Sequence, residues 1–204
     1  MRGLIITGVF LSVGCRTDKG TETSPSDDIG IIYADSQAPE LVLTLDAEST
    51  QAGQDVGFSL ALHYDDGDVE PVEGTLSSDL EPSLYSTYSS IQPTIAGAHT
   101  MSASLLWSET GETLTAEGQI SVDAGAINWV DLSLSDLAMQ AGGTVDYWIE
   151  AGDAWGNLID TSDTTLSLSS PDLVANEATI SSTVPGIYEL VATQGDVQDT
   201  ELLV

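Results

Sequence analysis

Few residues in this chain of 204 amino acids have side chains suited to covalent or acid–base chemistry. The only cysteine is Cys15, and the only histidines are His63 and His99. A Ser-His-Asp site needs a serine placed beside one of these histidines on a supporting loop, and the sequence contains no nucleophile-elbow pattern. We therefore predict no catalytic residue and no enzymatic activity. We expect a structural role for His99 and an exposed position for His63.

The densest group of possible metal ligands is an acidic turn that contains Asp65, Asp66, Asp68 and Glu70. Hard cations such as calcium take oxygen ligands of this type. The spacing does not match an EF-hand loop, which is longer and ends in a bidentate glutamate. Acidic residues are also common in solvated turns, where they bond to nearby backbone. A plain solvated turn is the favoured interpretation, calcium is the alternative, and no other cofactor is predicted.

Tryptophan offers the other binding chemistry, because exposed aromatic rings stack on sugars. Trp148 lies between Tyr147 and Ile149 and so faces away from the apolar side of its predicted strand. A carbohydrate contact through Trp148 is one hypothesis. Packing between two domains is the alternative explanation for an outward-facing tryptophan.

The charge balance excludes several kinds of partner. The sequence has 33 Asp and Glu residues against 3 Lys and Arg residues, and no Lys or Arg follows Lys19. A surface carrying only carboxylates repels phosphate backbones and anionic headgroups, so neither nucleic-acid binding nor electrostatic docking on anionic lipid is expected. Solubility in an extracellular or salty medium explains this charge better than a specific cationic partner does.

The N-terminus has the layout of an export signal. A positive start at Arg2 is followed by an uncharged, mostly apolar run, residues 3–13, that ends just before Gly14-Cys15. The run is too short to span a bilayer core as a helix. Its end resembles the lipobox of bacterial lipoproteins, which implies a signal peptide over residues 1–14 and a lipid on Cys15. An ordinary secretory signal with an incidental cysteine is the alternative.

Residues 15–39 are rich in Thr, Ser, Asp, Gly and Pro and predict a flexible tether. A tether of this length has a root-mean-square reach of about 25 to 30 Å, enough to lift a domain clear of the headgroups. Its one apolar run is Ile29–Tyr33, which we consider as an additional edge strand of the following domain.

The rest of the sequence contains an internal repeat. Gln51-Ala52-Gly53 recurs as Gln140-Ala141-Gly142, 89 residues later. The same offset pairs apolar positions of the two copies: Val56, Phe58 and Leu60 with Val145, Tyr147 and Ile149, and Met101 with Leu190. Two domains are therefore predicted, over residues 40–123 and 126–204.

Each copy alternates apolar and polar residues with the period of a half-buried strand, as in Val56–Tyr64 and Val130–Ser135. Turn sequences such as Asp65-Asp66-Gly67 and Trp155-Gly156-Asn157 separate these runs, and no long stretch keeps a helical period. Several short antiparallel strands in each copy predict an all-β chain of two tandem β-sandwich domains.

The second copy resembles the bacterial immunoglobulin-like domains of invasin- and intimin-type adhesins. The resemblance rests on Gly152–Asn157, which is similar to the Asp-x-aromatic-Gly-Asn turn of that family, and on Pro185–Tyr188, which is similar to the entry of strand F. It implies that the Tyr188 hydroxyl bonds to backbone at a corner. The first copy departs from this pattern, with Asp65–Asp68 in place of the aromatic turn and His99 in place of the tyrosine.

Together these features predict a lipid-anchored bacterial surface protein of the cell envelope, at the outer membrane or the cell surface. We expect a non-catalytic spacer, adhesion or protein-interaction module with a protein partner at the envelope. A cation- or carbohydrate-binding accessory lipoprotein is the alternative. Because one sandwich fold serves many functions, the sequence does not identify the ligand.

Overall fold

The computed structural model describes residues 38–204, and every regular element in this range is a β-strand. The all-β prediction is therefore confirmed. No element in the described range is a helix long and apolar enough to cross a membrane. Cys15, the predicted signal peptide and nearly all of the predicted tether lie outside the described residues.

Nine strands form the first sandwich: β1 (Glu40–Leu45), β2 (Ser49–Gln51), β3 (Val56–His63), β4 (Val69–Val72), β5 (Ser77–Ser78), β6 (Tyr85–Ser86), β7 (Ser90–Gln92), β8 (Gly97–Leu106) and β9 (Thr113–Asp123). One sheet has the order β1-β3-β7-β6, with β4 added beside β3, and the other has the order β2-β9-β8-β5. The chain changes sheets between β1 and β2, because β1 pairs antiparallel with β3 whereas β2 pairs parallel with β9.

Seven strands form the second sandwich: β10 (Ile127–Leu134), β11 (Thr144–Asp153), β12 (Thr165–Leu168), β13 (Leu173–Ala175), β14 (Thr179–Ser182), β15 (Tyr188–Gln194) and β16 (Val197–Leu203). The sheets are β10-β11-β14-β13 and β12-β15-β16. With the strands lettered A to G in chain order, these are the ABED and CFG sheets of an immunoglobulin constant-type sandwich. The first sandwich keeps this order and adds β2 and β4.

Each sandwich has a core of its own, built by the alternation seen in the sequence. Along β3 the inward residues Val56, Phe58, Leu60 and Leu62 are buried, while His63 at the strand end is exposed, as predicted. The first core is closed by Ile91, Met101 and Ile120, and the second by Leu132, Ile180, Leu190 and Leu203, all almost fully buried.

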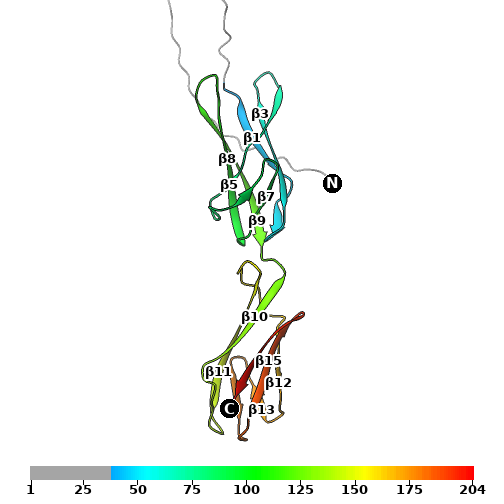
Figure 1. Ribbon diagram of the computed structural model, residues 1–204, viewed down its shortest axis with the longest axis vertical. Coiled ribbons are helices and arrows are strands. Elements are labelled where there is room, and N and C mark those ends of the chain that lie inside the picture. The colour runs from blue at the N-terminus through cyan, green and yellow to red at the C-terminus, as the bar shows by residue number, and fades with distance from the viewer. Residues whose placement is uncertain (1–37) are drawn as a thin grey trace, which may run out of the picture.

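Apolar packing carries the stability of both sandwiches, because the described residues include no Lys or Arg with which the carboxylates could pair. Burial of a Val, Leu, Ile, Phe or Met side chain contributes about 1.5–3 kcal/mol. The two sandwiches lie end to end, with β9 leading into β10 through residues 124–126 (Figure 1).

Candidate functional site at the junction of the sandwiches

The turn that follows β11 is organised by one carboxylate. Asp153 Oδ1 accepts hydrogen bonds from the backbone N–H groups of Trp155 and Asn157, each at 2.9 Å. Asp153 Oδ2 accepts from Asn157 Nδ2 at 2.8 Å and from the backbone N–H of Gly125 at 2.7 Å. Gly156 supplies the positive φ of 87° that closes the turn. The same carboxylate therefore shapes the turn and ties it to the linker between the sandwiches.

Four donors keep this carboxylate ionised although the residue is only 1% exposed. Burial by itself raises the pKa of Asp153, because it removes water from the charged form. The hydrogen bonds from Asn157, Gly125 and Trp155 act in the opposite direction and outweigh burial, so the pKa of Asp153 is lowered. The turn is thus built around a negative charge that its own donors stabilise.

Asn157 carries the contact across the junction. Its Oδ1 accepts a hydrogen bond of 2.8 Å from the backbone N–H of Ala96, and its Nδ2 donates to the carbonyl oxygen of Thr94, also at 2.8 Å. Because Asp153 also accepts from this amide nitrogen, the orientation of the Asn157 side chain is fixed before it reaches the first sandwich. The Asn157 side chain therefore hydrogen-bonds to two backbone groups of the neighbouring domain.

Trp155 packs against the first sandwich at Gly53. A Cβ atom on Gly53 would lie 2.5 Å from Trp155 Nε1, so a larger residue there would displace the indole. Gly53 also has a φ of 80°, its N–H donates to the carbonyl of Pro93 at 2.7 Å, and its carbonyl accepts from Gln92 Nε2 at 3.0 Å. The repeated turn sequence Gln51-Ala52-Gly53 of the first copy thus forms the surface that contacts the second domain.

The loop between β7 and β8, which Asn157 contacts, is fixed in place by buried side chains of the first sandwich. The buried Glu81 carboxylate accepts from the backbone N–H and the hydroxyl of Thr94 at 2.9 and 2.5 Å. The ring of His99 bonds to the carbonyl oxygen of Ile95 through Nε2 at 2.7 Å. The groups that Asn157 contacts are therefore positioned by buried side chains, which makes the junction a continuous hydrogen-bonded connection between two cores.

His99 occupies the place of a tyrosine corner, as predicted. In the second sandwich the Tyr188 hydroxyl donates to the carbonyl of Val184 at 2.6 Å, which is the corner that the resemblance implied. In the first sandwich His99 makes the equivalent bond to Ile95.

The sequence did not reveal that Ser78 lies beside His99, with Ser78 Oγ 2.8 Å from Nδ1. This pair is not arranged as a nucleophile and a base. Both residues are buried, and Ser78 Oγ also accepts from the backbone N–H groups of Leu80 and Glu81. The Nε2 atom faces a carbonyl oxygen rather than a carboxylate, so the pair ties strands together.

The acidic turn lies between β3 and β4, at the end of the first sandwich opposite the junction (Figure 1). Asp66 Oδ1 accepts from the backbone N–H of Asp68 at 3.0 Å, and Glu70 Oε2 accepts from the Tyr64 hydroxyl at 2.9 Å. Asp65 lies in the same exposed turn. Nowhere in residues 38–204 do three or more Asp, Glu, His or Cys side chains converge in a way that could hold a metal ion.

Trp148 is 48% exposed on the outer face of β11, as its sequence position predicted. The alternative explanation, packing between domains, applies instead to Trp155, which contacts Gly53 of the first sandwich. The turn motif around Trp155 is the sequence feature that distinguishes the two tryptophans, because it places the Trp155 ring at the end of the sandwich and not on a sheet face.

No protein-family model matches the chain, and no curated protein matches it. Among solved structures, the Escherichia coli adhesin FdeC aligns with a TM-score of 0.49 and 16% identity over 81% of this chain and 64% of that one. Yersinia pseudotuberculosis InvD aligns with a TM-score of 0.46 and 20% identity over 80% of this chain and 56% of that one. The chain thus spans less than two thirds of either structure. The immunoglobulin-like assignment rests on the sheet order and the Tyr188 corner of this chain.

Proposed function

We propose that this protein is a lipid-anchored surface lipoprotein of a bacterial cell envelope, whose two sandwiches act as a non-catalytic spacer that presents an interaction surface to a protein partner. The observation that carries the spacer role is the Asp153–Asn157 turn, which bonds the second sandwich to the backbone of the first. A spacer must resist bending between its domains, and a polar connection of this kind restricts rotation where a bare linker permits it.

The anchor is supported by the sequence, with Cys15 at the end of an apolar run and a polar stretch between it and the first strand. The charge supports an exposed location, because a surface without Lys or Arg beyond residue 19 remains soluble and repels anionic membranes. A lipid is then the means by which such a chain stays at a membrane surface.

The anchor is tested by expressing the chain with its own N-terminus in a bacterial host, beside a Cys15→Ala variant. We expect the parent to gain the mass of a diacyl or triacyl group and to enter the detergent phase, whereas the variant does neither. If both remain unmodified and soluble, the anchor is refuted and the protein is a secreted factor.

The spacer is tested with Asn157→Ala, which removes the two bonds to the first sandwich. We expect both sandwiches to stay folded while small-angle scattering reports a broader distribution of interdomain distances. Asn176→Ala is the matched control, because Asn176 lies in an exposed loop and its side chain makes no hydrogen bond within the described residues. Equal scattering of all three proteins would refute a junction fixed by Asn157.

A carbohydrate-binding role is the second candidate, because Trp148 presents an exposed ring on a sheet face. Sugars stack on such rings and change indole fluorescence. The test is titration of soluble glycans against the parent and Trp148→Ala, with quenching expected only in the parent. Absence of quenching by any tested glycan would remove this candidate.

A further inference from the structure

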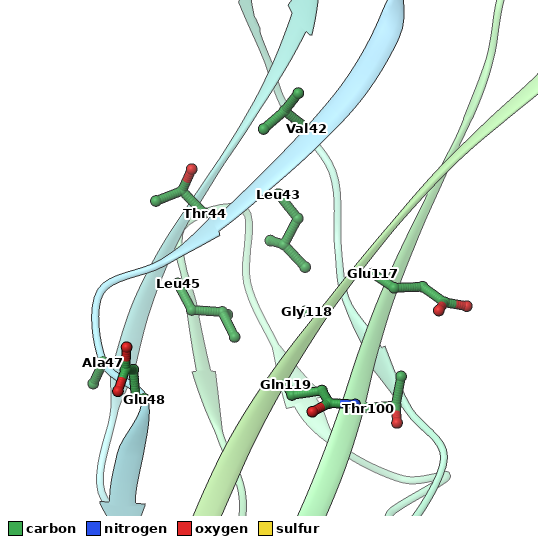
Figure 2. Close-up of a pocket in the computed structure, with 10 residues that line it drawn as sticks. All are labelled: Val42, Leu43, Thr44, Leu45, Ala47, Glu48, Thr100, Glu117, Gly118 and Gln119. Atoms are coloured by element: carbon green, nitrogen blue, oxygen red, sulfur yellow. The ribbon is translucent and has the colours of Figure 1, made fainter. Parts of the chain in front are cut away.

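A groove runs along the open side of the first sandwich, between β1 of one sheet and β9 of the other (Figure 2). Its volume is about 240 Å³. Leu43 and Leu45 lie in it, half-buried, and face Gly118 across the gap between the sheets. The missing side chain at Gly118 leaves room for these leucines, since a Cβ atom there would lie 3.2 Å from each of them. The floor of the groove is therefore apolar and partly uncovered.

The β1 side of the groove is an unpaired strand edge. The backbone N–H of Asp46 donates to the carbonyl of Gly57, which identifies the alternate residues Thr44 and Val42 as those that bond to β3. The backbone groups of Leu43 and Leu45 consequently point away from β3 and toward the groove. The structure shows no hydrogen bond from β1 to β9 within residues 38–204.

The β9 side is unpaired over most of its length by the same argument. The backbone N–H of Trp107 donates to the carbonyl of Glu112, so even-numbered residues of β9 bond to β8 and odd-numbered residues face outward. At the lower end, Ser121 uses its outward N–H to bond to Glu48 beside β2. Above it, the outward groups of Glu117 and Thr115 meet no strand in the described residues.

The second sandwich closes the corresponding place with a side chain. Leu132 of β10 is the counterpart of Leu43, 89 residues later, and its backbone N–H donates to Asp199 Oδ2 of β16 at 2.8 Å. No side chain in the described residues bonds to the backbone N–H of Leu43. The first sandwich thus has an open groove at the place where a hydrogen bond joins the two sheets of the second.

We propose that the groove is filled by the chain's own segment Ile29–Tyr33, which adds a strand along β1. The segment lies outside the described residues, and the argument rests on its sequence and on its distance along the chain. Only the six residues 34–39 separate it from β1, whose first residue is Glu40. A loop of this length is long enough to reverse the chain and return the segment along the open edge.

The segment has the side chains that the groove lacks. In an extended strand Ile29, Ile31 and Tyr33 share one face and could cover Leu43 and Leu45. It is the one apolar run in an otherwise polar stretch, and covering an unpaired edge is a common way of preventing association with other chains. A short linker also gives an effective concentration in the millimolar range, which favours the internal segment over a partner's strand.

Docking of this segment would shorten the free part of the tether. With residues 15–28 left free, the root-mean-square reach falls to about 20 Å, compared with about 25 to 30 Å for the whole tether. This consequence rests on the proposed lipid anchor, whereas the docking itself does not.

The test uses the full chain with Cys15→Ser, so that the result is independent of lipidation. Backbone amide exchange is measured by NMR at Leu43, Thr115 and Glu117 in this parent, in Ile31→Asp and in Ser26→Asp. The control Ser26→Asp adds the same charge outside the apolar run. We expect exchange at Leu43 to be faster by about tenfold or more in Ile31→Asp and unchanged in Ser26→Asp. Amides of Met101 and Ile120, in the core of the first sandwich, report that this sandwich remains folded in each variant.

Two results would overturn the proposal. Equal exchange at the groove in all three proteins would mean that the edge is open in the intact chain. Protection that increases with protein concentration would assign the added strand to a second copy instead. Neither result bears on the proposed spacer, which is tested at Asn157.

Discussion

The turn after β3 and the turn after β11 occupy equivalent places in the two sandwiches but contain different side chains. Tyr64 and Asp68 of the first copy correspond to Asp153 and Asn157 of the second. Both turns keep a glycine with positive φ, 93° at Gly67 and 87° at Gly156. The backbone conformation of the turn is therefore common to both sandwiches, whereas its side chains differ according to whether another domain lies next to the turn.

The difference follows the position of each turn in the molecule. The second turn faces another sandwich, and there Asp153 gathers four donors while Asn157 bonds to Thr94 and Ala96. The first turn lies at the opposite end of its sandwich, and its side chains bond only within the turn and to Glu70. We infer that Asp153 and Asn157 serve the connection between the domains as well as their own turn, because the first turn keeps the same glycine without them.

The largest expected effect comes from Asp153→Ala. Removing the carboxylate leaves four donors without their acceptor, three of them backbone N–H groups, and each unsatisfied buried group is costly. We expect the free energy of unfolding of the second sandwich to fall by about 2–4 kcal/mol. Urea unfolding followed by tryptophan fluorescence measures this loss, since Trp129, Trp148 and Trp155 all lie in that sandwich.

Asp66→Ala is the matched change in the first turn. It removes a single exposed bond to Asp68, so a loss of about 0.5 kcal/mol or less is expected. Equal losses in the two variants would contradict the distinction between the turns.

The contribution of Asp153 should also depend on pH in a defined direction. Its pKa is lowered in the folded state, so its stabilisation is complete above the unfolded pKa of about 4 and is lost as the pH falls through the folded value. The difference in unfolding free energy between the parent and Asp153→Ala should therefore be constant near neutrality and shrink below about pH 4.

The two corners give the next largest effect. Tyr188→Phe removes the hydroxyl that donates to Val184 and lies 3.1 Å from Ser182 Oγ, while it preserves the apolar ring. We expect a loss of about 1–2 kcal/mol in the second sandwich. If the corners are equivalent, His99→Phe should destabilise the first sandwich at least as much, because it removes the bonds to both Ile95 and Ser78. If urea unfolding shows no change in the unfolding free energy of the first sandwich in His99→Phe, the two corners are not equivalent.

A matched pair of glycines isolates the interdomain contact. Gly53 and Gly142 are equivalent by the repeat and have φ values of 80° and 85°, so alanine costs about 1–2 kcal/mol of backbone strain at either site. Only Gly53 has Trp155 beside it, since nothing lies within 4 Å of a Cβ atom at Gly142.

We expect Gly53→Ala alone to shift the fluorescence of Trp155 and to broaden the interdomain distances in scattering. The same shift in Gly142→Ala would mean that Trp155 does not sense the contact at Gly53.

The strands could be predicted from the sequence because the alternation of apolar and polar residues follows which side of a strand faces the core. Val56, Phe58 and Leu60 alternate with polar residues and are buried as predicted. The repeat offset also placed His99 on the Tyr188 corner, because the two residues occupy the same step of one pattern.

The junction could not be read from the sequence, although its motif was visible. The Gly152–Asn157 turn was identified as a fold feature, yet the atoms it contacts, at Gly53, Thr94 and Ala96, are glycine or backbone groups that carry no side-chain pattern. Likewise, Ser78 lies 21 residues before His99, and only the pairing of β5 with β8 brings them together.

The smallest expected effect lies in the first turn. The Tyr64 hydroxyl donates to Glu70, and this bond together with the neighbouring negative charges raises the pKa of Tyr64 above its usual value of 10.0. Glu70→Gln removes the charge, so the pKa of Tyr64 should fall toward that value while the unfolding free energy changes little, because the pair is exposed. NMR titration of the Tyr64 ring in the parent and in Glu70→Gln measures the shift. An unchanged Tyr64 titration would mean that the Tyr64–Glu70 bond is not populated in solution. The side chains of the first turn would then make neither this local bond nor a bond to another domain, whereas Asn157 of the second turn bonds to the first sandwich.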